Sequence, residues 1–154
     1  MIWFQRSAGA FFWFFFYFLL TLAYFTFFGV MAVALTPNVA FANMFCSFFF
    51  GLWNLLCGFL ITVKQMPRYS FWFYYIDPVS WSLYGLATAQ LKDFGDETII
   101  GFDGVEQSIP DFLESYFGYK ASMLGPIVAI LLAFSACFIG VSVFGFSRLN
   151  FQSR

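Results

Sequence analysis

Two long stretches of this chain contain no charged side chain, and they constrain its fold more than any other feature. The first covers the 57 residues between Arg6 and Lys64, and the second covers the 27 residues from Ala121 to Ser147. A charge at the centre of a bilayer costs about 2.5–3.5 kcal/mol on insertion scales, and an apolar helix needs about 20 residues to cross ~30 Å of hydrocarbon. The first stretch is therefore long enough for two membrane crossings and the second for one.

The acidic residues separate these two stretches. All eight of them lie between Asp77 and Glu114, which predicts one polar loop. The composition is 62% hydrophobic with a mean hydropathy of +0.81, too little polar surface for a water-soluble fold. A net charge of −1 without basic clusters argues against nucleic acid as a partner.

Thr36-Pro37-Asn38 divides the first stretch, because proline lacks the amide hydrogen and disfavours helix at the residue before it. We therefore expect spans at about 8–35, 39–63 and 124–144, with a loop over about 64–123. Each span is long enough to cross a bilayer at 1.5 Å per residue. The predicted fold class is an all-α integral membrane protein with three transmembrane helices.

The loop divides into an aromatic part and an acidic part. Residues 66–90 are rich in tryptophan and tyrosine and are interrupted by Pro67 and Asp77-Pro78, which predicts a re-entrant or interfacial segment at headgroup level. Ser108-Ile109-Pro110-Asp111 has the features of a helix start, with an N-cap serine and an acid in the first turn. We expect a short amphipathic helix to follow it.

Two of the predicted spans carry small or polar residues at helical spacing. In the second span these residues are Asn43, Ser47, Gly51, Asn54, Gly58 and Thr62. In the third span they are Gly125, Ala129, Ala133, Ala136 and Gly140. In lipid, helices associate through close backbone packing and polar contacts rather than through the hydrophobic effect, so both stripes predict packing against something other than lipid.

Asn54 is the candidate functional residue that the pattern singles out. An amide within a span either bonds a neighbouring helix, at on the order of 1 kcal/mol, or lines a substrate path. Phe59 and Leu60 follow Gly58 and are candidates for an apolar constriction. The residues alone leave these alternatives open.

Several chemistries are excluded by what the sequence does not contain. There is no histidine, no G-x-x-x-x-G-K-[ST] phosphate loop and no calcium-binding loop pattern, so the chain has no nucleotide site and no predicted metal site. It is not expected to be an enzyme. Cys46, Cys57 and Cys137 lie in the apolar stretches and are expected to be small hydrophobic residues rather than a disulfide framework.

Five stretches of this chain resemble stretches of one protein family, in the same order and at similar spacing. That family is the G subfamily of ATP-binding-cassette transporters, in its full-size pleiotropic-drug-resistance branch. Tyr24–Asn38 is similar to the fourth membrane helix of that family and the turn after it, and Gly51–Phe59 to its fifth helix. The remaining stretches resemble the family's large loop and C-terminus: Asp77–Leu86, Asp111–Lys120 and Asn150–Gln152.

Three sites depart from the family pattern. Tyr69-Ser70 stands where paired tryptophans are usual, Cys57 where serine is common, and Asp77 where an uncharged residue is usual. Met1–Phe4 is similar to an internal family segment. By this resemblance the chain corresponds to the last three helices of the second membrane domain. ATP and magnesium would be bound by nucleotide-binding domains that this chain does not contain.

The resemblance also implies topology and site roles. It implies a multi-pass protein, expected in the plasma membrane, with the 64–123 loop extracellular and the C-terminus cytosolic. The second span would line the substrate cavity through Gly51, Asn54 and Gly58. Phe59 and Leu60 would form the apolar plug between cavity and exit.

The interpretation that follows is the membrane part of an ATP-driven exporter of hydrophobic or amphipathic small molecules. Its partners would be the remaining membrane helices, the nucleotide-binding domains, lipid and the substrate. The main alternative is a small autonomous membrane scaffold or regulatory subunit without transport activity of its own. A channel of identical subunits is disfavoured, because no span carries a charge that would form a ring. The sequence also leaves open a further alternative, a truncated product with no activity.

Overall fold

The computed structural model describes residues 8–58, 67–68, 71–91, 98–100 and 106–149. Its long elements are α1 (Ala8–Leu35), α2 (Val39–Leu56) and α6 (Leu124–Arg148). All three are long and apolar enough to cross a membrane, which confirms the predicted fold class. At 1.5 Å per residue they are about 42, 27 and 37 Å long.

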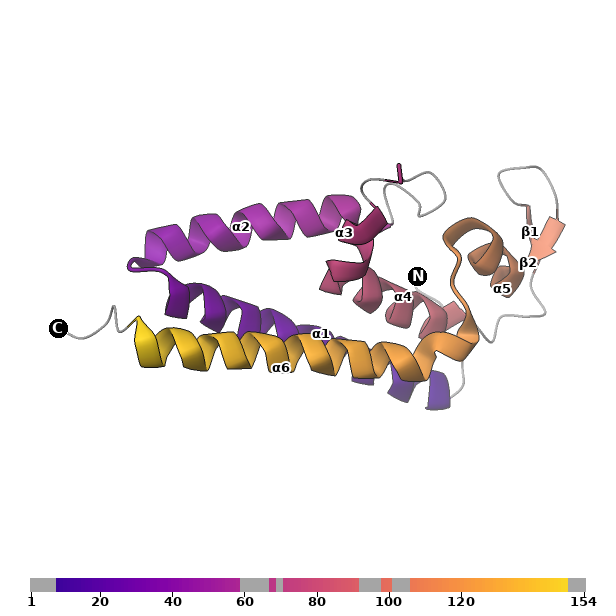
Figure 1. Cartoon of the computed structure of the whole chain (residues 1–154). Helices are drawn as coiled ribbons and strands as arrows, with labels where there is room; N and C mark the ends of the chain where they lie inside the picture. The colour runs from indigo at the N-terminus through magenta and orange to yellow at the C-terminus, as the bar shows by residue number, and fades with distance from the viewer. Residues whose placement is uncertain (1–7, 59–66, 69–70, 92–97, 101–105, 150–154) are drawn as a thin grey trace.

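The shorter elements belong to the region between α2 and α6. They are α3 (Phe71–Ile76), α4 (Pro78–Leu91), the antiparallel strand pair β1 (Thr98–Ile100) and β2 (Glu106–Ser108), and α5 (Ile109–Phe112). A π-helical turn at Leu113–Phe117 continues α5, and a 3₁₀ turn at Ala121–Met123 leads into α6. In Figure 1, α1 and α6 lie side by side, while α2 diverges from them toward the end where α4 lies.

Local signals account for the helix starts. Asn38 is the N-cap of α2, because its side-chain oxygen accepts a hydrogen bond from the Ala40 amide at 2.7 Å. Ser108 is the N-cap of α5, as the sequence predicts, and its hydroxyl oxygen accepts from the Asp111 amide at 3.3 Å. The predicted apolar face of this segment includes Leu113, which is buried, whereas Asp111 and Glu114 are exposed.

The structure differs from the expected limits of two spans. Helix α2 ends at Leu56 instead of continuing to about residue 63, because Gly58 adopts a left-handed conformation with φ of 86° one residue beyond the C-cap. Gly58 therefore ends the helix instead of extending its small-residue stripe. Helix α6 continues to Arg148, four residues beyond the expected end, because neither proline nor a left-handed glycine interrupts it. Residues 59–66, which include Phe59, Leu60 and Thr62, lie outside the described residues.

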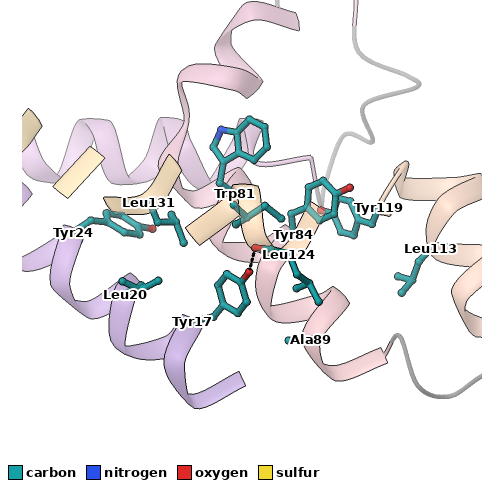
Figure 2. Packing of buried hydrophobic residues seen from close by; sticks show 11 residues of the cluster. Tyr17, Leu20, Tyr24, Trp81, Tyr84, Ala89, Leu113, Tyr119, Leu124 and Leu131 are labelled. Carbon is teal, nitrogen blue, oxygen red and sulfur yellow. Dashed lines mark hydrogen bonds between the residues drawn. The ribbon is translucent and has the colours of Figure 1, made fainter. Parts of the chain in front are cut away.

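Two apolar clusters hold the helices together. The larger cluster joins α1, α4 and α6 and extends to the turn before α6; the members that Figure 2 labels are Tyr17, Leu20, Tyr24, Trp81, Tyr84, Ala89, Leu113, Tyr119, Leu124 and Leu131. The smaller cluster joins α1 and α2 through Phe28, Met31 and Trp53, with Phe138 of α6 packed against it. The Phe28 and Trp53 ring centroids are 4.6 Å apart.

Glycines provide the closest approaches between helices. A Cβ placed on Gly145 of α6 would lie 3.0 Å from the Ala34 carbonyl oxygen of α1. A Cβ on Gly85 of α4 would lie 2.5 Å from a ring carbon of Tyr17. Both distances are shorter than an ordinary van der Waals contact, so these glycines allow the helices to approach as small residues do in membrane proteins.

The first prediction concerns the contact between α4 and α1. Gly85→Ala should destabilise the fold by about 1–3 kcal/mol, because the Tyr17 ring is fully buried and has no free space into which to move. Thermal unfolding of the detergent-solubilised chain would measure this. Gly140→Ala is the matched control, since no atom of a neighbouring element lies within 4 Å of a Cβ there, and it should leave stability unchanged or raise it by up to about 1 kcal/mol, because alanine favours the helix. Equal effects of the two substitutions would contradict the proposed packing.

Candidate functional site

The candidate substrate path lies on the side of α2 that faces away from the other described helices. Asn43, Ser47, Gly51 and Asn54 are all exposed on this side. On the opposite side of the helix, Ala42 and Trp53 are buried. The structure therefore brings four of the predicted stripe residues together on one helical face, and it places Gly58 beyond the end of that helix.

Asn54 has no interhelical partner among the hydrogen bonds of the described residues. Its amide nitrogen donates to the Phe50 carbonyl oxygen of its own helix at 2.7 Å. The side chain is exposed although its neighbour Trp53 is in the core. Within the described part of the chain, then, Asn54 does not join α2 to another helix, and its path-lining role stays a prediction.

The stripe of α6 is exposed in the same way. Gly125, Ala129, Ala133, Ala136 and Gly140 all lie on the surface, opposite the residues with which α6 packs on α1. No heavy atom lies within 4 Å of a Cβ built on Gly51, Gly125 or Gly140. Each stripe thus forms an exposed face of small or polar residues, and its role in packing against a further helix stays a prediction.

Sequence reasoning missed a set of hydrogen bonds that joins α1, α4, the start of α6 and the turn before it. The Tyr17 hydroxyl of α1 donates to the Leu124 carbonyl oxygen at the start of α6. The Ser82 hydroxyl of α4 donates to the Tyr24 hydroxyl oxygen at 3.2 Å. The Lys120 amide donates to the Tyr84 hydroxyl oxygen at 2.6 Å. The sequence contained a signal for these contacts. Tyr17 and Tyr24 are the only tyrosines of α1, and their spacing of seven residues places them on one face of that helix.

Asp77 joins α3 to α4 and is the most deeply buried acidic residue that the structure describes. Only 1% of its surface is exposed. One carboxylate oxygen accepts from the Val79 amide at 2.8 Å and the other from the Ser80 hydroxyl at 2.9 Å, while Pro78 occupies the first helical position. Asp77 is thus the N-cap of α4. Burial raises the pKa of its carboxyl from 3.8 to about 6, although its hydrogen bonds oppose this rise.

No group of three or more histidine, cysteine, aspartate or glutamate side chains that could hold a metal occurs within the described ranges. Within the described residues, Cys46, Cys57 and Cys137 are not joined in disulfides, and Cys57 is the buried one. The described residues therefore offer tyrosine and serine hydroxyls, the carboxylate of Asp77 that caps α4, and the amide side chains on the exposed side of α2. These are groups for positioning helices and contacting a ligand.

Comparison with known proteins identifies the class. The sequence profile of the family described as "ABC-2 type transporter" matches residues 1–91. This chain belongs to that family, as a membrane-spanning part of transporters of the ABC class. Its relatives are members of the plant G subfamily and of the pleiotropic-drug-resistance type, which confirms the resemblance found from the motifs.

Three relatives illustrate the similarity. "Pleiotropic drug resistance protein 1" of Nicotiana tabacum is 42% identical over 154 residues, 100% of this chain and 10% of the relative. "ABC transporter G family member 31" of Arabidopsis thaliana is 42% identical over 153 residues, 99% of this chain and 11% of the relative. "ABC transporter G family member 36" of the same plant is 35% identical over 154 residues, again 100% and 10%. The chain thus spans about a tenth of the length of these relatives.

The second prediction concerns Asp77. Because the folded state raises the pKa of this carboxyl above 3.8, folded protein binds more protons than unfolded protein between about pH 4 and 6. Stability should therefore fall as pH rises through this window and be constant above it. Asp77→Asn keeps a capping oxygen and removes the charge. It should therefore flatten the dependence of stability on pH and raise the free energy of unfolding at pH 7 by up to about 3 kcal/mol.

Thermal unfolding of the wild type and of Asp77→Asn between pH 4 and 7 would measure how the stability of each protein depends on pH. Glu106→Gln, at an exposed acidic residue, is the control and should keep the wild-type slope. A slope that persists in Asp77→Asn would show that another group causes it.

Proposed function

We propose that this chain is the membrane-spanning portion of an ATP-driven exporter of hydrophobic or amphipathic small molecules. The family and the length of the relatives support this, since the chain corresponds to about a tenth of each of them. The nucleotide-binding domains that bind ATP and magnesium would lie outside this chain. The 64–123 loop would be extracellular, the C-terminus cytosolic and the membrane the plasma membrane.

The observation that carries the proposal is the exposed polar side of α2. Polar side chains such as Asn43, Ser47 and Asn54 are not expected on a helix that faces only lipid, because a polar group in hydrocarbon is costly without a partner. The same helix has an aromatic inner side that fixes it to α1 through Trp53. An amide and a hydroxyl on an otherwise apolar wall suit amphipathic substrates, which need a few polar contacts for orientation.

The proposed mechanism is alternating access. Closure of the nucleotide-binding domains on ATP would move α2 relative to a facing helix and open the path outward. Gly51 and Asn54 would form part of the cavity wall, and Phe59 and Leu60 would separate the cavity from the exit. The α3–α4 segment would cover the outer end.

The third prediction tests this role in the complete transporter. Asn54→Leu should change substrate-stimulated ATPase activity or transport by about fivefold, because one polar contact to the substrate is worth about 1 kcal/mol. Abundance should be unchanged, since within the described part of the chain the Asn54 amide bonds only its own helix. Transport into inverted vesicles and immunoblotting would measure both quantities.

Phe48→Leu is the matched control, because Phe48 is an exposed apolar residue on a different side of α2. It should leave transport unchanged. Parallel loss of protein and transport in Asn54→Leu would show that Asn54 packs against another helix instead. Absence of any ATP-dependent transport by the wild-type transporter, with a stable 17.7 kDa product in cells, would favour the scaffold or regulatory alternative.

A further inference from the structure

Two cavities share a pair of aromatic side chains, Tyr75 and Trp81, in their linings. The first, which we term the loop cavity, has a volume of about 380 Å³ and is lined by Tyr74, Tyr75, Trp81, Tyr84, Phe117 and Lys120, among others. The second, which we term the span cavity, has a volume of about 370 Å³ and is lined by Tyr75, Trp81, Ile130, Ala133, Phe134 and Cys137. The shared residues make the two cavities neighbours.

The loop cavity has an aromatic lining. The Trp81 ring lies 6.0 Å from that of Tyr75 and 6.4 Å from that of Tyr84, with the planes of Trp81 and Tyr84 within 7° of parallel. Faces of aromatic rings attract cations, and quaternary ammonium groups are the cations that such cages bind. No carboxylate is among the described residues that line this cavity, so a small hydrated cation lacks a suitable ligand here.

A single charged side chain lines the described wall of the loop cavity. Lys120 is 60% exposed, and its ammonium nitrogen lies 3.6 Å from a carboxylate oxygen of Glu114. A simple cation would be repelled by this lysine. A zwitterion that carries a phosphate next to its quaternary ammonium would instead place the phosphate beside Lys120 and the ammonium against the rings. Phosphocholine is such a group.

The span cavity has a different chemistry. Its lining residues on α6 are apolar apart from the Cys137 thiol, and they run from Ile130 to Cys137, about 10 Å along a membrane-spanning helix. This length fits within one leaflet of about 15 Å, half of the ~30 Å hydrocarbon core. An acyl chain that lies along α6 would fill this cavity and contact Tyr75 and Trp81 from the membrane side.

We propose that the two cavities together bind one choline phospholipid from the leaflet on the side of the 64–123 loop. The trimethylammonium group occupies the loop cavity, the phosphate lies beside Lys120, and an acyl chain enters the span cavity. The proposal requires only that the chain lies in a membrane and does not depend on the proposed export function.

Lipid retention by the full chain tests the proposal. The purified protein is equilibrated with equal amounts of phosphatidylcholine, phosphatidylethanolamine and phosphatidylglycerol that have identical acyl chains, and bound lipid is counted by native mass spectrometry. Phosphatidylcholine should be retained about fivefold or more over the other two, because only its headgroup has a quaternary ammonium. Equal retention of all three lipids would overturn the proposal.

Two variants separate the contributions. Tyr75→Leu should remove the preference for phosphatidylcholine over phosphatidylethanolamine, whereas Lys120→Gln should weaken the retention of both by a similar factor. Tyr75 and Lys120 are exposed side chains, so these changes leave the core intact. Trp72→Leu, an exposed aromatic residue of α3, and Arg148→Gln, at the far end of α6, are the controls and should retain the wild-type preference. Loss of preference in the Trp72 variant would overturn the assignment to these cavities.

Discussion

The contact of Tyr17 with two other helices is the interaction on which the described arrangement depends. Apolar side chains gain little by leaving lipid for a helix interface, so membrane helices associate through shape and polar contacts. The Tyr17 ring lies where a side chain at position 85 would be, and its hydroxyl bonds the Leu124 carbonyl. One side chain of α1 therefore positions both α4 and the start of α6. The Ser82–Tyr24 bond adds a second attachment, one α1 heptad away.

Helix α2 is attached by a different kind of contact. It meets the bundle through the aromatic cluster of Phe28, Trp53 and Phe138, and within the described residues these side chains make ring contacts rather than hydrogen bonds between helices. Dispersion between rings is favourable and weakly directional, so it tolerates small displacements that a short hydrogen bond does not. In the proposed alternating-access cycle, this difference would allow α2 to shift relative to α1, α4 and α6.

The parts of the fold that follow local rules were predictable from the sequence. The charge-free stretches predicted the three spans, Pro37 predicted the turn between the first two, and Ser108 predicted a helix start, because each depends on neighbouring residues or on the solvent. The close approach of Gly85 to Tyr17 was not predictable in this way. Its partners are 68 residues apart, and no local pattern pairs them.

The candidate site was predictable only as a face. Helical spacing placed Asn43, Ser47, Gly51 and Asn54 on one side of α2, and the structure has them there. The same spacing wrongly extended this face to Gly58, because periodicity does not reveal that a glycine has taken a left-handed conformation and ended the helix. The burial of Asp77 was also missed, since the residue follows an exposed isoleucine and precedes a proline, a sequence that resembles an ordinary surface turn.

Asp77 shows the physical cost of burying the start of a helix. The first amides of α4 have no partner within the helix, and water is not available to them where Pro78 and Ser80 are buried. A carboxylate satisfies the Val79 amide and the Ser80 hydroxyl at once, which an apolar side chain does not. The cost is a buried charge, and this burial raises the pKa of the carboxyl.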